Sequence, residues 1–143
     1  MATDYIVTPR AGHASIRVDA GGNAWIESYR CVDCSAVLSS RAMACRSCGS
    51  RTPMQTFRVA ESGMVYSWTV VHRSYPGIAV PFVSAIVDLE GGPTLKGNLR
   101  IDDPDTVRQG VRVRLVFDDA GGAHDKDGAP YVGFHFVPEG TGA

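Results

Sequence analysis

Hydrophobic and polar residues alternate with a period of two along most of the second half of the chain, which is the pattern of half-buried β-strands. Residues 111–117, Val-Arg-Val-Arg-Leu-Val-Phe, show it most clearly. Gly and Pro residues separate the alternating segments, as they do between short strands. The sequence therefore predicts a mainly β protein, with strands at residues 64–72, 82–89, 94–101, 111–117 and 131–137.

A short helical turn is predicted between the third and fourth of these strands. Asp103 precedes Pro104, which suits the first position of a helix, and Gly110 suits the end of one. Five strands with a short helix between the third and the fourth is the order expected of an OB-fold, a five-stranded Greek-key barrel. We therefore expect an OB-fold barrel in the second half of the chain.

Two smaller segments precede the predicted barrel. Residues 15–26 alternate on either side of Ala-Gly-Gly-Asn at 20–23, which predicts a small N-terminal β-hairpin. A change in composition and in charge near residue 58 marks a module boundary. We divide the chain into an N-terminal segment (1–29), a four-cysteine ribbon (30–58), an OB-fold barrel (59–138) and a short tail (139–143).

Length and composition exclude two classes of protein. The chain has 143 residues, 44% of them hydrophobic, which is enough for a core and excludes wholesale disorder. No apolar run approaches the roughly 18 residues that span a bilayer, so no membrane association is expected. The first residues lack the basic and apolar regions of a signal peptide, which predicts a cytoplasmic protein.

The net charge of −1 conceals a basic segment beside an acidic one. Residues 30–58 hold five arginines against Asp33 alone, which gives +4, whereas residues 59–143 sum to −4. The near-neutral total argues against a nucleic-acid-binding protein that works through bulk charge.

All four cysteines lie in two C-x-x-C pairs, Cys31/Cys34 and Cys45/Cys48, separated by ten residues. Each pair forms a tight turn that aims two thiolates at one ion, and the excursion between them brings the second turn opposite the first. Disulfides are disfavoured in a cytoplasmic chain, and a redox dithiol uses one such pair in a βαβ setting. We predict a structural zinc site with no open position; iron is the alternative, because four thiolates do not distinguish the two metals.

The sequence contains none of the common catalytic motifs. Every cysteine belongs to the predicted metal site, and the histidines lie on separate segments, at positions 13, 72, 124 and 135. A self-sufficient hydrolase would need an unrecognised Ser/His/Asp set. The aromatic residues Tyr66, Trp68, Phe134 and Phe136 could stack bases on an OB-fold surface, but their alternate strand positions favour the core.

At these residues the chain resembles a known family. The matching segments are Tyr29 to Cys34, Cys45 to Ser50, the run 62–73 (Ser-Gly-Met-Val-Tyr-Ser-Trp-Thr-Val-Val-His-Arg), 81–92 and 97–99, with shorter matches up to Phe134. They are similar to the acyl-CoA-associated OB-fold proteins with a rubredoxin-like zinc ribbon, a domain of unknown function. Members usually begin with a helical, aromatic-rich segment, and here a hairpin is predicted instead.

The resemblance implies a non-catalytic accessory subunit of a thiolase-superfamily enzyme, which is a thiolase, a hydroxymethylglutaryl-CoA synthase or an aldolase. Such a subunit braces the catalytic one and can contribute to a CoA channel, in pathways that include aromatic and steroid acyl-CoA degradation. We expect Arg41, Arg46 and Arg51 to lie near the phosphates of CoA or near an acidic patch on the partner. A free-standing OB-fold nucleic-acid-binding protein and a self-sufficient acyl-CoA hydrolase are the alternatives.

Overall fold

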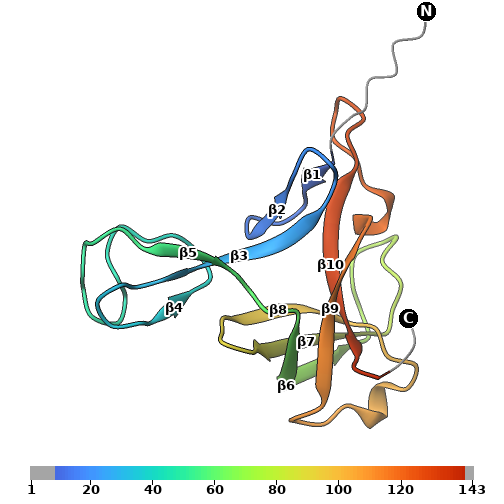
Figure 1. The fold of residues 1–143 in the computed structure, drawn as a ribbon. Coiled ribbons are helices and arrows are strands. Elements are labelled where there is room, and N and C mark those ends of the chain that lie inside the picture. Colours follow the sequence, from blue (N-terminus) through green and yellow to red (C-terminus); the bar gives the residue numbers. More distant parts are fainter. Residues whose placement is uncertain (1–8, 141–143) are drawn as a thin grey trace, which may run out of the picture.

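The chain, described here for residues 9–140 by a computed structural model, folds into two β-sheets (Figure 1). The larger sheet forms a barrel, from which the long strand β3 leads to a small projecting module. The strands of the larger sheet are β1 (Arg10–Ala11), β6 (Ser62–Val71), β7 (Phe82–Leu89), β8 (Thr94–Leu99), β9 (Arg112–Asp118) and β10 (Tyr131–Pro138). Those of the smaller sheet are β2 (Ile16–Val18), β3 (Ala24–Arg30), β4 (Val37–Leu38) and β5 (Gln55–Arg58).

The five long strands close into a barrel with OB-fold connectivity. The pairing order is β6-β7-β8-β10-β9, and β9 pairs β6 again, which leaves no free edge among the five. The pairing of β8 with β10 is parallel, with Leu99 opposite Phe136, and the other pairings in the barrel are antiparallel. The predicted fold class is confirmed, and the strands lie within two residues of the predicted ranges.

The connection between β8 and β9 is a 3₁₀ turn, η1 (Pro104–Thr106), rather than a longer helix. The Asp103 side chain accepts a hydrogen bond from the Asp105 N–H, as the Asp-Pro sequence predicts. The turn ends after three residues because Val107 returns to an extended conformation and is completely buried in the barrel core. The connection therefore covers one part of the core, with Val107 buried in it.

The N-terminal hairpin and the barrel share one core. Ile16 and Ile26, opposite each other on β2 and β3, belong to the same apolar cluster as Val65, Val87 and Phe136.

The turn of this hairpin is stabilised by Asp19, whose carboxylate accepts hydrogen bonds from the backbone N–H groups of Gly21 and Asn23. The hairpin thus fixes the direction in which β3 leaves the barrel.

The small module is built from β3, β4 and β5 and has a separate core. β3 pairs β4 through residues 29–30 and β5 through residues 27–30. The sequence analysis did not predict β4 and β5, because strands this short carry too few residues to show alternation. The domain boundaries at 29/30 and 58/59 remain predictions, and β3 runs continuously across the first of them.

Two aromatic side chains expected in the core lie at the surface instead. Tyr66 is 57% exposed and Trp68 is 38% exposed, whereas Phe136 is buried and Phe134 is half-buried. The neighbouring Val65 is buried, so Tyr66 lies on the outward face of β6 by ordinary alternation. Tyr66 is also the extra residue of a β-bulge and has no partner on β7. Alternation shows which residues share a face of a strand, and it does not show which face is buried.

In the part of the chain that the structure describes, no helix has the length and apolarity needed to cross a membrane.

We expect Gly97→Ala to destabilise the barrel. A methyl group on this residue would lie 2.7 Å from Cε2 of Phe134 and 2.8 Å from Cε2 of Phe136, closer than carbon atoms approach. Overpacking of this kind costs about 1–3 kcal/mol, which thermal unfolding followed by circular dichroism would detect as a lowered Tm. Asn98→Ala, on the exposed neighbouring position of the same strand, is the control, and an equal Tm for both variants would contradict the expectation.

Candidate metal centre

Two similar backbone turns present the four cysteines. In the first, the Ser35 N–H donates to the Cys31 carbonyl at 2.9 Å, and in the second the Gly49 N–H donates to the Cys45 carbonyl at 2.8 Å. The residue after the last cysteine of each turn has a positive φ, 64° at Ser35 and 77° at Gly49. Glycine adopts this conformation without strain, so the Cys-Gly sequence fits the second turn.

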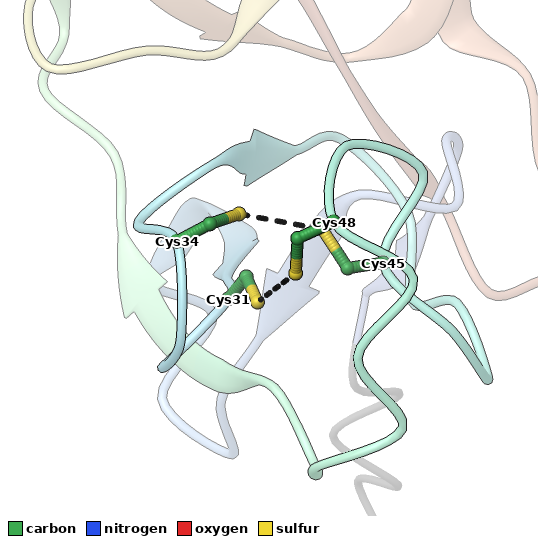
Figure 2. A group of neighbouring side chains, drawn as sticks. All are labelled: Cys31, Cys34, Cys45 and Cys48. Carbon is green, nitrogen blue, oxygen red and sulfur yellow. Dashed lines mark hydrogen bonds between the residues drawn. The ribbon is translucent and has the colours of Figure 1, made fainter.

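The turns bring the four sulfur atoms together, as Figure 2 shows. Cys31 Sγ lies 3.7 Å from Cys48 Sγ and Cys34 Sγ lies 3.6 Å from Cys45 Sγ, and all four sulfurs are within 4.8 Å of one another. A tetrahedral ion with Zn–S bonds of about 2.3 Å separates its ligands by about 3.8 Å. The four cysteines can therefore hold one metal ion, and their geometry fits zinc.

The sulfurs without an ion compete for protons. The backbone N–H groups of Cys48 and Ser47 lower the pKa of the Cys45 thiol to about 7. At Cys48 the backbone N–H of Ser50 lowers the pKa, but desolvation and the three other sulfurs together outweigh it and raise the pKa to about 12. Four thiolates at this distance repel one another, and a divalent cation removes the conflict.

The module around the cysteines has little else to stabilise it. Its buried cluster consists of Tyr29, Cys31, Cys45 and Met54. Two of these four residues are themselves ligand candidates, so their sulfurs supply both the core and the metal site. A core of this size needs a bound metal or a similar crosslink.

The structure separates the three candidate arginines. Arg41 and Arg51 line one hollow of about 380 Å³, together with Met43 and Met54. Arg46 lies in the second cysteine turn and does not line it. The Arg41 guanidinium lies 5.1 Å from the centre of the Tyr29 ring. Among residues 9–140, none of the three forms an ion pair, so their charges are free for an anionic ligand or partner.

One polar pair was not predicted from the sequence. His135 Nδ1 lies 2.6 Å from Asp118 Oδ2, and both side chains are largely buried. The strand register places Gly133 opposite Asp118, so His135 and Asp118 lie on one face of adjacent strands. The loop of twelve residues between these strands hides that register in the sequence. No serine or threonine hydroxyl within the described residues bonds to His135, so the pair lacks the nucleophile of a hydrolase triad.

Three comparisons with known proteins agree with this architecture. A family model described as the C-terminal OB-fold domain of ChsH2 matches residues 58–118. A DUF35 domain-containing scaffold protein of Methanocaldococcus jannaschii is 30% identical, over 76% of this chain and 78% of the relative. A protein of Pyrococcus furiosus with the same description is 31% identical, over 66% of this chain and 69% of the relative.

Two further similarities are to a CoA-hydratase subunit and to a solved aldolase chain. The 3-oxo-4,17-pregnadiene-20-carboxyl-CoA hydratase alpha subunit of Mycobacterium tuberculosis is 45% identical over 58 residues, which are 40% of this chain and 19% of that subunit. A solved chain of the Ltp2-ChsH2(DUF35) aldolase superimposes with a TM-score of 0.64 and 30% identity. The superposition covers 80% of this chain and 84% of the solved one.

We expect removal of one sulfur ligand to abolish stable metal binding. Cys45→Ser exchanges a buried thiolate for a weaker hydroxyl ligand, and a structural zinc site does not tolerate the loss of one of four ligands. Metal content measured by atomic emission should fall from about one ion per chain to near zero. Ser47→Ala, two residues away on the surface, should keep the metal; retention of the ion by Cys45→Ser would contradict the assignment.

Proposed function

Because the chain belongs to the DUF35 family, whose relatives named above are scaffold proteins, we propose that it is a non-catalytic accessory subunit of a thiolase-superfamily enzyme acting on acyl-CoA. The observation that carries the proposal is the similarity to the Ltp2-ChsH2(DUF35) aldolase chain, because it extends over four-fifths of both chains rather than over the barrel alone. In this proposal the partner supplies the catalytic groups, and this chain braces it.

A structural zinc ion is part of the proposal. Four thiolates occupy every position of a tetrahedral site, which leaves none for substrate. When bound, the ion supplies a crosslink between the two cysteine turns. Cys31, Cys34, Cys45 and Cys48 would hold it and fix the shape of the surrounding module.

We further propose that the ribbon arginines face either CoA or the partner. Arg41 and Arg51 share an exposed hollow whose other side chains are apolar or neutral, and a guanidinium pair of this kind suits phosphate or carboxylate groups. Arg46 lies outside this hollow, in the second cysteine turn, and we propose the same role for it. The name of the hydratase relative supports an acyl-CoA substrate, and steroid or aromatic acyl-CoA degradation is the pathway we propose.

Complex formation with a defined partner tests the proposal. The chain should co-purify with the thiolase-superfamily protein of its host when the two are co-expressed, and the complex should elute as one species in size-exclusion chromatography with light scattering. Acyl-CoA turnover should require the partner and not appear in this chain alone. A chain recovered as a lone monomer under these conditions would overturn the proposal.

The arginines give a sharper prediction. In the complex, Arg41→Ala and Arg51→Ala should each weaken CoA binding about tenfold, since a hydrogen bond to a charged group contributes about 1.5–3 kcal/mol. Isothermal titration with CoA would measure the loss. Arg114→Ala, on barrel strand β9, is the control. Unchanged CoA affinity in both ribbon variants would remove the CoA role and leave the partner as the target.

Simple measurements test the two alternative functions. A nucleic-acid-binding protein would show affinity that falls steeply with salt, and a gel shift at two salt concentrations tests this. The exposed Tyr66 and Trp68 offer stacking surfaces, but the acidic balance of the barrel repels phosphates. Thioesterase activity in the purified single chain would support the hydrolase.

A further inference from the structure

The carboxylate of Asp33 bridges the two cysteine turns. Asp33 lies inside the first turn, between Cys31 and Cys34. Its Oδ2 accepts a hydrogen bond from the hydroxyl of Ser50 and a second one, at 3.2 Å, from the hydroxyl of Thr52. Ser50 and Thr52 follow the second turn, so one carboxylate oxygen ties together the two halves of the metal centre.

Backbone contacts extend this bridge to the ligands themselves. The Cys45 N–H donates to the carbonyl of Ser50 at 2.8 Å, and the Thr52 N–H donates to the hydroxyl of Ser50 at 3.2 Å. Ser50 therefore accepts a hydrogen bond from the start of the second turn and donates one to the first turn. A displacement of Asp33 is transmitted to Cys45 through only one intervening residue.

Charge alone does not explain an acidic residue at this place. Asp33 is the one acidic residue of segment 30–58, and four thiolates around a divalent ion already carry a net charge of −2. The arginines of the segment favour an acidic residue in general, but among the described residues none of them forms an ion pair with Asp33, and the four sulfurs repel a further anion. The two hydroxyl groups that donate to its oxygen offset this repulsion. Asp33 therefore occupies this position because of the hydrogen bonds that it accepts.

The same bridge holds one of the candidate arginines. Arg51 lies between the two hydroxyl residues that Asp33 binds, and its side chain lines the hollow that it shares with Arg41. The backbone on both sides of Arg51 is therefore anchored to the first cysteine turn. The position of the arginine is linked to the geometry of the sulfur cluster.

We propose that Asp33 is a positioning residue that locks the second cysteine turn and the Arg51 backbone against the first turn, so that one contact sets both the metal site and the arginine hollow. The inference rests on the metal centre of the proposed function. It assigns no metal bond to Asp33, which acts through Ser50 and Thr52.

Zinc affinity in the full-length chain tests this role. Asp33→Ala should weaken Zn²⁺ binding about tenfold or more, in the range observed when groups that orient metal ligands are removed. Competition with a chromophoric chelator measures this loss. The Co²⁺-loaded variant should keep the absorption spectrum of a tetrahedral tetrathiolate site, because its four ligands are unchanged. Asp33→Asn, whose side-chain oxygen still accepts from Ser50, should lose less affinity than Asp33→Ala.

Matched variants separate the bridge from general damage to the module. Thr52→Ala removes one donor to Asp33, and Thr56→Ala removes an exposed hydroxyl on β5 that makes no hydrogen bond within the described residues. The first should weaken Zn²⁺ binding in the wild-type chain and have no further effect in Asp33→Ala, whereas the second should have no effect in either. The Tm of the barrel should not change in any of these variants.

Limited proteolysis tests the second part of the inference, that Asp33 holds the backbone at Arg51 in place. In the zinc-loaded Asp33→Ala variant, trypsin should cleave after Arg51 faster than in the wild type, with cleavage after Arg41 as the internal reference. Zinc affinity of Asp33→Ala within twofold of the wild type, or equal to that of Thr56→Ala, would overturn the inference alone. A wild-type chain that binds neither Zn²⁺ nor Co²⁺ would overturn the proposed metal centre and the inference together.

Discussion

Mutual repulsion among four closely spaced sulfurs is the constraint on which the projecting module depends. The cysteine turns are determined by backbone bonds and by two residues of positive φ, which place the sulfurs before any ion is considered. The apolar cluster beneath them is too small to hold the turns against that repulsion. A divalent cation would convert the repulsion into a crosslink between the two turns. Arg41 precedes the second turn and Arg51 follows it, so the shape of this loop would depend on that crosslink.

The barrel satisfies a different constraint, the closure of its strand edges. The parallel pairing of β8 with β10 and the return pairing of β9 with β6 leave the backbone polar groups of the five strands matched. Its core is large and apolar, and no ligand is needed to complete it. The molecule therefore combines a barrel that is stable through burial with a module whose small core leaves it dependent on its sulfur cluster. Each offers a partner a different kind of surface, one acidic and one basic.

Period-two alternation and turn residues were enough to predict the barrel, because its strands are long and separated by Gly and Pro. Cysteine spacing was enough to predict the sulfur cluster, because two C-x-x-C turns separated by ten residues can bring four thiolates to one ion. The exposure of Tyr66 was missed because alternation sorts residues onto two faces of a strand without indicating which face is buried. The pair of His135 and Asp118 was missed because it depends on strand register across a loop. The local pattern of residues predicts where strands lie. Contacts between strands also depend on how the strands are aligned with each other, which the local pattern does not show.

Strand β3 belongs to both halves of the molecule, with Ile26 in the barrel core and Tyr29 in the core of the module. Because side chains alternate along a strand, removing one residue between these two positions would turn the module to the opposite side of the barrel. The direction in which the ribbon presents its arginines is therefore encoded in the number of residues in one strand. Inserting or deleting one residue in β3 would therefore point the arginine-bearing surface in a different direction without changing the barrel or the cysteine turns.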